Sequence, residues 1–427
     1  MVIVVGAGPA GATAARALAR AGVTVRLLDR SKFPRNKPCG GGISFRVLKR
    51  FPYLESELGR IATHTVARLY LEGPGGESTI VESDGPAALM IRRVEFDRLL
   101  VDLACEAGAE LVEGVDIVRA STTGETVALE ARDGRRFEAG CVIAADGVHS
   151  IVARRLGLNP GWPATAVALD MMEETPREQL RDVDPSTLWV SYGFEPRDTR
   201  GAGASSAEGY AYIFPKRDHV NVGIGYVLDH FRRAVDRAPY DLQRGFVDHL
   251  RDRGVMEGES VRSNFTPFLI PVGGPLRQPG RGRVLLAGDA GGFVNGFTAE
   301  GIYYAMVSGE LAARTIVETR DADMATMARR YARACDREIG AELRDSVLIQ
   351  RHLFADRRRI AQVIAGAQSA PELTRLILDF AMGRISYPVL RRRMLTRAPL
   401  LAAHLLWARI RNWWVPAVAP VVQTGKP

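Results

Sequence analysis

Three short glycine-rich segments, far apart in the chain, have the composition that dinucleotide binding requires. They are GAGPAG at residues 6–11, ADG at 145–147 and AGDA at 287–290, and each follows a short apolar run. Glycines let a backbone approach phosphate groups closely, and a carboxylate at a strand end accepts hydrogen bonds from sugar or ribityl hydroxyls. Three such strand ends together indicate a site for one extended cofactor.

The first glycines fit a turn between a strand and a helix. We expect a buried parallel strand over residues 2–5 and an alanine-rich helix over residues 9–21. Gly6 permits the tight turn, Gly8 lets the backbone approach a pyrophosphate, and Gly11 lets the helix lie close to the sheet. The phosphates would then meet free N–H groups at the positive end of the helix dipole.

The next predicted strand, residues 24–28, ends in Asp29, which lies 18 residues after Gly11. A carboxylate there can accept hydrogen bonds from the hydroxyls of an adenosine ribose. The later segments favour FAD over NAD. Asp289 is placed for a ribityl hydroxyl, and a helix expected from about Thr298 offers its N-terminal amides to a flavin ring. We therefore predict a non-covalently bound FAD.

Composition is that of an ordinary globular protein. The 427 residues, 46% apolar and 25% charged, can form a large core and two intertwined domains. We expect a cytoplasmic protein, because the run at residues 2–5 is too short for a signal peptide and lacks a basic flank. Four separated cysteines without a CxxC pair predict no disulfide framework and no metal site; they are Cys39, Cys105, Cys141 and Cys335.

The formal net charge of +8 is concentrated near the carboxyl end. Residues 351–427 hold 13 lysine or arginine residues against 3 aspartate or glutamate residues, and the remainder is close to neutral. This distribution gives no support to a nucleic-acid partner.

Residues 321–427 are expected to be helical and basic. An apolar stretch near their end carries Trp407, Trp413 and Trp414, but arginines interrupt it, so it is too short to span a bilayer. Two roles stay open for this region. It could lie as a peripheral helix on an anionic membrane surface, or it could pack on the body of the protein as a cap.

Three longer stretches carry a family resemblance. They are FPRNKPCGGG at residues 33–42, GYAYIFPK at 209–216, and residues 288–309. On these motifs the chain resembles the geranylgeranyl reductase family of FAD-dependent oxidoreductases over about residues 1–320. That family shares the FAD fold of the aromatic hydroxylases. The resemblance implies an α/β protein in which a Rossmann-type FAD-binding domain is interleaved with an antiparallel-sheet substrate domain.

The expected domain boundaries follow the motifs. The FAD-binding domain comprises residues 1–60, 93–158 and 276–320, the substrate domain comprises 61–92 and 159–275, and the helical basic region comprises 321–427.

The resemblance also implies roles for individual residues. The adenosine half of FAD would be held by Gly6, Gly8, Ala10, Gly11 and Asp29. Its remaining part would meet Gly40, Gly42, Arg93, Asp289, Gly301 and Ile302, with Arg93 near the cofactor's linker. Cys39 would face the substrate, where its thiol could position the substrate or deliver a proton to the alkene carbon opposite hydride attack.

Two departures from the family pattern concern the substrate. The family's Asn-Pro-x-Thr-Gly-Glu-Gly loop stands here as NGFTAEG at residues 295–301. Its Tyr-x-Trp-x-Phe segment stands here as Tyr210, Tyr212 and Phe214, so one ring is smaller and gains a hydroxyl. These three residues alternate along a predicted strand and share one face, which forms either a wall for a prenyl chain or part of the core.

The predicted activity is the reduction of carbon–carbon double bonds in an isoprenoid lipid or quinone side chain. No second dinucleotide fingerprint is present, so the electron donor, NAD(P)H or a small redox protein, would dock transiently. Two alternatives remain. One is a flavin monooxygenase, hydroxylase or halogenase acting on a small molecule. The other is a non-catalytic flavin electron carrier at a membrane surface.

Overall fold

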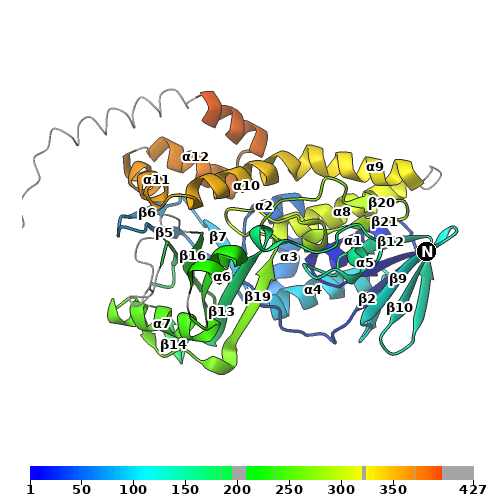
Figure 1. Cartoon of the computed structure of the whole chain (residues 1–427), viewed down its shortest axis with the longest axis horizontal. Coiled ribbons are helices and arrows are strands. Elements are labelled where there is room, and N and C mark those ends of the chain that lie inside the picture. Colours follow the sequence, from blue (N-terminus) through cyan, green and yellow to red (C-terminus); the bar gives the residue numbers. More distant parts are fainter. Residues whose placement is uncertain (183, 195–207, 236, 320–323, 370, 397–427) are drawn as a thin grey trace, which may run out of the picture.

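Two sheets and a layer of C-terminal helices build the molecule in the computed structural model (Figure 1). The structure describes residues 1–182, 184–194, 208–235, 237–319, 324–369 and 371–396. The mainly parallel sheet lies at the right in Figure 1 and the larger antiparallel sheet lies at the left, with the helices along the top. This is the mixed α/β fold that the sequence predicts.

The first sheet is parallel except at one edge. In spatial order its strands are β20 (Gly280–Arg281), β21 (Val284–Leu286), β12 (Cys141–Ala144), β1 (Val2–Val5), β2 (Val25–Asp29) and β8 (Glu110–Glu113). Val2 and Val4 point into one apolar cluster, whereas Ile3 and Val5 point into another. Both faces of β1 are therefore buried, which explains its unbroken apolar run.

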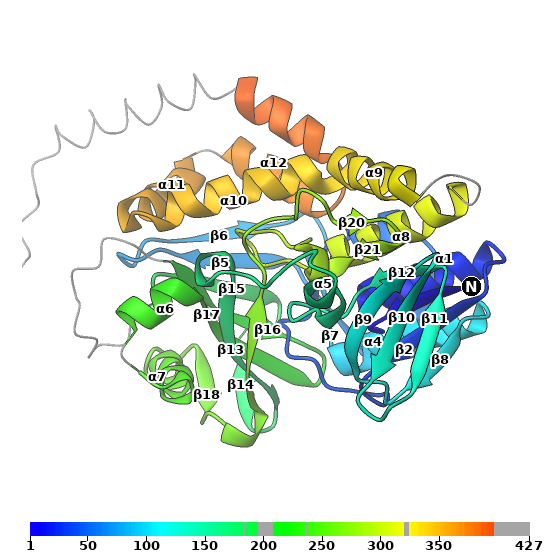
Figure 2. The same ribbon diagram turned by 45° about the vertical axis from the view of Figure 1, so that its right-hand side comes forward.

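Different elements cover the two faces of this sheet. One face carries helices α1 (Pro9–Arg20), α4 (Arg93–Glu106) and α8 (Ile302–Glu318). The other carries α5 (Ile151–Arg155) and a three-stranded sheet of β9 (Ile117–Thr123), β10 (Thr126–Ala131) and β11 (Arg136–Ala139). Figure 2 shows these three strands in front of the parallel sheet.

The second sheet has seven strands, and all but one pair of neighbours run antiparallel. In order they are β19 (Phe265–Ile270), β13 (Ala168–Pro176), β17 (His219–Val227), β16 (Gly209–Pro215), β15 (Thr187–Tyr192), β5 (Arg68–Glu72) and β6 (Ser78–Glu82). Helix α7 (Pro239–Asp252) covers one face through Phe246 and Leu242. The opposite face presents Tyr210, Tyr212 and Phe214 in one cluster, which confirms their predicted common side.

Short elements connect the sheets. A small sheet joins β3 (Gly42–Ile43), β7 (Ala88–Ile91) and β4 (Thr63–Val66). The accompanying short elements are α2 (Arg46–Arg50), α3 (Leu54–Glu57), α6 (Leu228–Ala234) and the two-stranded pair β14 (Leu180–Asp182) and β18 (Met256–Gly258).

The C-terminal helices extend along both sheets (Figure 2). They are α9 (Met324–Cys335), a π-helical turn (Asp336–Gly340), α10 (Ala341–Phe354), α11 (Arg357–Ser369) and α12 (Pro371–Ala381). The Tyr331 hydroxyl donates to the Leu286 carbonyl at 2.7 Å, and the Ser44 hydroxyl donates to the Ala381 carbonyl at 2.8 Å. The described part of this region therefore packs on the body of the protein.

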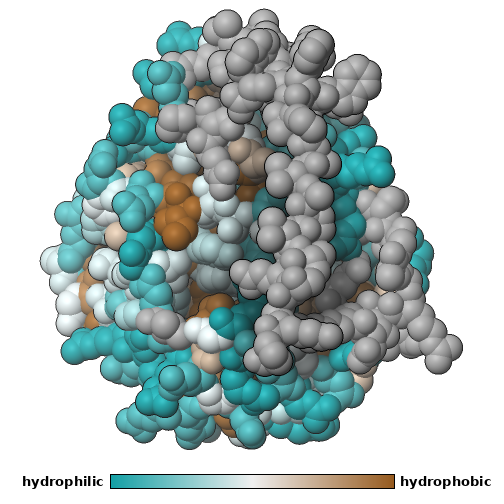
Figure 3. Space-filling model, turned by 90° about the vertical axis from the view of Figure 1, so that its left-hand side faces the viewer, coloured by the Kyte–Doolittle hydropathy of each residue, from teal (hydrophilic) through white to brown (hydrophobic). Residues whose placement is uncertain are grey.

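The stretch with Trp407, Trp413 and Trp414, for which the sequence allows either a membrane-surface helix or a cap, lies outside the described residues. Within the described ranges, no helix combines the length and apolarity needed to cross a bilayer. Figure 3 shows one end of the molecule, where apolar spots interrupt a largely hydrophilic described surface. Several exposed large apolar side chains belong to the C-terminal region; they are Leu348, Ile349, Val363, Ile377 and Leu395.

Candidate functional site

A cavity of about 520 Å³ runs from the carboxyl ends of the parallel strands to the aromatic face of the antiparallel sheet. Fourteen of the fifteen predicted site residues line it, from Gly6 and Asp29 at one end to Tyr210 and Phe214 at the other. The exception is Gly11, where a Cβ atom would lie 1.8 Å from the Gly6 carbonyl oxygen. Gly11 therefore serves helix packing, as its position in the motif predicts.

The adenosine end is held together by Asp29. Its carboxylate accepts hydrogen bonds from the Ala7 N–H at 2.7 Å and the Ser31 N–H at 2.8 Å, so it orders the glycine turn itself. The Arg35 guanidinium lies 3.8 Å from Asp29 and about 3.6 Å from where a Cβ of Gly8 would stand. A cation beside the glycine turn suits a pyrophosphate, and the motif analysis did not identify it.

The two later aspartates both line the cavity but have different partners. Asp146 accepts hydrogen bonds from the Ile151 N–H at 2.8 Å and the Val152 N–H at 3.2 Å, so it binds the first free amides of α5. Asp289 lies in the cavity wall near Lys37 and Arg93. Burial raises the pKa of the Asp289 carboxyl, while these two cations act in the opposite direction.

The loop with Cys39 is fixed from several sides. The Asn221 side-chain amide donates to the Cys39 carbonyl at 3.2 Å, and the Gly41 N–H lies 3.4 Å from the Cys39 sulfur, which accepts its hydrogen bond. Arg93 forms a bidentate ion pair with Asp97 at 2.6 and 2.8 Å. Burial alone would lower the pKa of Arg93, but Asp97 and Cys39 outweigh it and the pKa is raised.

The loop at residues 295–301 corrects one expectation. The helix predicted from about Thr298 begins at Ile302. The Asn295 side-chain oxygen accepts hydrogen bonds from the backbone N–H groups of Phe297 and Thr298, at 3.0 Å each. The backbone N–H of Asn295 donates to the Glu300 carbonyl at 2.9 Å. With Ala299 at a φ of 55°, these contacts close a turn that α-helical geometry cannot continue.

A buried network supports this loop from behind. The Arg46 guanidinium binds both oxygens of Glu342, at 2.8 and 2.9 Å, and the Tyr304 hydroxyl donates to Glu342. The Asn295 side-chain nitrogen lies 3.4 Å from the Tyr304 hydroxyl. Glu342 therefore connects α2 and α10 to the turn that precedes α8.

The aromatic wall combines rings with polar contacts. The Tyr210 hydroxyl donates to the Thr298 carbonyl at 2.7 Å, and the Tyr212 hydroxyl lies 3.1 Å from Asp170 Oδ2. Phe297 stacks on Tyr192 with ring centroids 5.9 Å apart. The sequence predicts the loop of Phe297 near the substrate, but sequence patterns did not identify Asp170, because only the tertiary structure brings it to the cavity.

Two further ionisable side chains in the cavity wall, Lys37 and Glu300, were not among the site residues predicted from the sequence. Lys37 Nζ lies 2.8 Å from the centroid of the Phe268 ring, and burial together with Arg93 lowers the pKa of Lys37 to about 8. Burial raises the pKa of Glu300 to about 7, and its Oε1 makes no hydrogen bond within the described structure. In the described ranges, no group of three or more His, Cys, Asp or Glu side chains is arranged to hold a metal ion.

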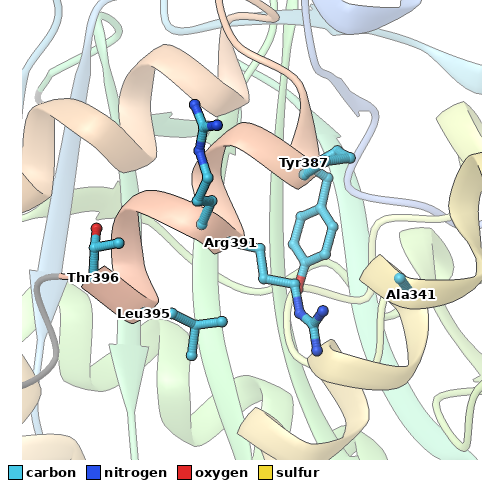
Figure 4. A pocket seen from close by; sticks show the side chains of 7 residues that line it. Ala341, Tyr387, Arg391, Leu395 and Thr396 are labelled. Atoms are coloured by element: carbon cyan, nitrogen blue, oxygen red, sulfur yellow. The ribbon is translucent and has the colours of Figure 1, made fainter.

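A second, smaller hollow of about 430 Å³ lies between α10 and the helical residues 387–396 (Figure 4). Tyr387 and Arg391 both bind Asp345 there, at 2.7 and 2.8 Å. The hollow shares no lining residue with the larger cavity, so the larger cavity is the candidate active site.

The residues present fit FAD. The cavity offers the glycine turn and Arg35 to a pyrophosphate, Asp29 to a ribose, and Asp289 with the Gly301 backbone to the flavin half. A long, partly charged and partly apolar cavity is what such a cofactor and an adjoining hydrophobic substrate require.

Comparison with known proteins agrees with this geometry. Residues 1–221 match the FAD binding domain family. The chain is 30% identical to digeranylgeranylglycerophospholipid reductase 2 of Methanopyrus kandleri over 406 residues, covering 92% of this chain and 96% of the relative. It is 34% identical to the menaquinone reductase of Mycobacterium tuberculosis over 333 residues, covering 75% and 77%.

The fold is also similar to a solved structure. A geranylgeranyl bacteriochlorophyll reductase-like protein from Thermoplasma acidophilum superposes with a TM-score of 0.72 and 20% identity, covering 95% of this chain and 98% of that one.

Proposed function

This chain belongs to the FAD binding domain family, and we propose its substrate class from that premise. Its relatives include a digeranylgeranylglycerophospholipid reductase and a menaquinone reductase. It is an FAD-dependent oxidoreductase of the geranylgeranyl reductase type. The proposed reaction is the reduction of carbon–carbon double bonds in an isoprenoid lipid or in the isoprenoid side chain of a quinone. Both named relatives act on molecules that carry such chains.

One observation carries the proposal. A single cavity joins the dinucleotide edge of the parallel sheet to a wall of aromatic side chains. A flat, apolar isoprenoid segment would find complementary surface on Tyr210, Tyr212, Phe214 and Phe297, next to the loop of Cys39.

The roles of the chain's own residues follow from this arrangement. Reduced FAD supplies the hydride when it is bound. The glycine turn with Arg35 and Asp29 would hold the nucleotide half, and Asp289 with the backbone of Gly301 and Ile302 would orient the flavin half. The aromatic wall would orient the double bond and exclude water from it.

The polypeptide must also supply a proton, because adding a hydride to an alkene leaves one carbon to be protonated. Cys39 is one candidate from its place in the cavity wall. The electron donor, NAD(P)H or a small redox protein, and contact of the C-terminal region with an anionic membrane both remain parts of the proposal.

The test uses the full chain loaded with FAD and reduced by dithionite under anaerobic conditions. It is mixed with digeranylgeranylglycerol phospholipid and, separately, with menaquinone, and lipid products are analysed by mass spectrometry. We expect flavin reoxidation together with a product that has gained two hydrogen atoms per reduced double bond. Reoxidation only in the presence of oxygen, with a hydroxylated or halogenated product, would instead identify a monooxygenase or halogenase. Reduction of the quinone ring without any product saturated at a side-chain double bond would identify an electron carrier.

A further inference from the structure

Asp170 is a carboxyl group in the cavity wall that none of the three family motifs includes. It lies on β13, paired with Gly225 of β17 and Phe268 of β19, and is 6% exposed. Burial of a lone carboxyl among apolar groups is costly, so its persistence there requires a partner or a protonated state.

The partner of Asp170 is Tyr212. The Tyr212 hydroxyl donates to the carboxyl group and lies 3.2 and 3.1 Å from its two oxygens. The ring reaches this position across Gly223, where a Cβ atom would lie 2.5 Å from the Tyr212 hydroxyl. A tryptophan, which the family pattern has at this position, carries no hydroxyl, so the phenol and carboxyl pair depends on the tyrosine found here.

Few ionisable groups of the described residues act on the pair. The residues paired with Asp170 on β17 and β19 are the uncharged Gly225 and Phe268, and the ionisable groups that act on Asp170 and Tyr212 are Lys37, Tyr210 and Cys39. Burial raises the pKa of Asp170 from 3.8 to about 7, against the opposing effects of Tyr212 and Lys37. Burial, with the negative charge of Asp170, raises the pKa of Tyr212 well above 10, so its hydroxyl keeps its proton.

This pair differs from Cys39 as a proton source. In the contact that the structure shows, the Cys39 sulfur accepts a hydrogen bond from the Gly41 N–H. Tyr212 instead has a hydroxyl in the cavity wall whose partner is a carboxyl group. When the Asp170 carboxyl is protonated it can donate to the Tyr212 oxygen, which frees the Tyr212 proton to face the cavity. A carboxyl whose pKa lies near neutral pH is also suited to resupply the proton that Tyr212 gives up.

We propose that Tyr212 donates the proton in double-bond reduction and that Asp170 acts behind it as the positioning and reprotonating group. This inference rests on the proposed function. With the bound reduced flavin as the source of hydride for one alkene carbon, the π bond would break and the other carbon would take the Tyr212 proton. The Asp170 carboxyl proton passes to the tyrosine oxygen, and the carboxylate left behind regains a proton from water.

The first test needs neither substrate nor turnover. Infrared spectra of the oxidised, FAD-loaded protein are recorded across pH, and those of the Asp170→Asn variant are subtracted. We expect a protonated carboxyl band that disappears as the pH rises through about 7. A difference spectrum that shows Asp170 ionised at about pH 5 would overturn the proposal.

The second test is anaerobic single turnover. We expect the rate constant of the wild type to fall above about pH 7, the Asp170→Asn variant to lose this inflection, and Tyr212→Phe to slow the reaction about 100-fold. Tyr212→Trp should not restore the rate, although it restores the ring of the family pattern. An unchanged rate in Tyr212→Phe would overturn the proposal and leave the proposed function intact.

Glu173→Gln is the matched control. Glu173 lies on the same strand and burial also raises its pKa to about 7, but its carboxyl binds Ser260 and the Val261 N–H outside the cavity. This variant should keep the wild-type pH profile of turnover. If the wild type reduces no alkene while the infrared band of Asp170 titrates as expected, the proposed function fails and the protonation of the pair stands.

Discussion

The buried ion pair between Glu342 and Arg46 leads to a quantitative prediction for protein stability and FAD binding. Its carboxylate is 3% exposed and the Arg46 side chain is 10% exposed, with Tyr303 and Phe380 rings 4.1 and 4.3 Å from the guanidinium. Removing the charge of Glu342 would leave this cation enclosed without its counterion.

The perturbation is Glu342→Gln. Loss of one partner of a buried ion pair costs about 3–5 kcal/mol, and we expect the lower end, because glutamine keeps the side chain's shape and can still accept a hydrogen bond. Because Glu342 connects through Tyr304 to the Asn295 turn beside the cavity, FAD affinity should also fall, by about tenfold for a loss of about 1.4 kcal/mol.

The assay is urea unfolding of the apoprotein followed by tryptophan fluorescence, with FAD binding measured separately by titration. The matched control is Asp102→Asn, which removes an i,i+4 ion pair of 2.8 Å whose side chains are 45% and 28% exposed. This control should change the free energy of unfolding by about 0.5 kcal/mol or less. The double variant Arg46→Met with Glu342→Leu should be more stable than Glu342→Gln, because no unpaired charge remains. A loss below about 1 kcal/mol in Glu342→Gln would refute this account of the network.

Three further predictions concern packing and pH. Gly11→Ala should prevent FAD incorporation, because its Cβ would lie 1.8 Å from the Gly6 carbonyl oxygen; flavin absorbance of the purified variant checks this. Gly40→Ala would place a Cβ 2.5 Å from the Phe214 ring of the substrate wall, and a cost of about 1–3 kcal/mol should raise the substrate KM about fivefold or more in steady-state assays. The pKa of Glu173 is raised from 4.5 to about 7, so this carboxyl binds more protons in the folded than in the unfolded protein. Its contribution to the free energy of unfolding is therefore complete below about pH 4.5 and falls by about 3 kcal/mol as the pH rises to 7. Urea unfolding should show this decline in the wild type and a smaller one in Glu173→Gln.

Local patterns predicted most of the nucleotide half of the site. The strand at residues 2–5 and the glycine turn are adjacent in sequence, and Asp29 ends the next strand of the same strand–helix–strand unit, so local patterns suffice to place them. Such patterns failed at Thr298, where the Asn295 side-chain oxygen accepts backbone hydrogen bonds that close a turn, so the helix begins only at Ile302. Patterns also did not show that Asp146, besides lining the cavity, binds the first amides of α5.

The sequence by itself determined the cofactor class, the parallel strands that end at the cofactor and the alternation that puts Tyr210, Tyr212 and Phe214 on one face. Each motif is encoded by neighbours within a few residues, and the cofactor class follows from three such motifs in one chain. Only the tertiary structure decided that Asp170, 42 residues before Tyr212, meets its hydroxyl, and that Glu342 closes on Arg46, 296 residues away. Ionisation in the cavity depends on burial and on partners from distant segments, and neither is a property of a local pattern.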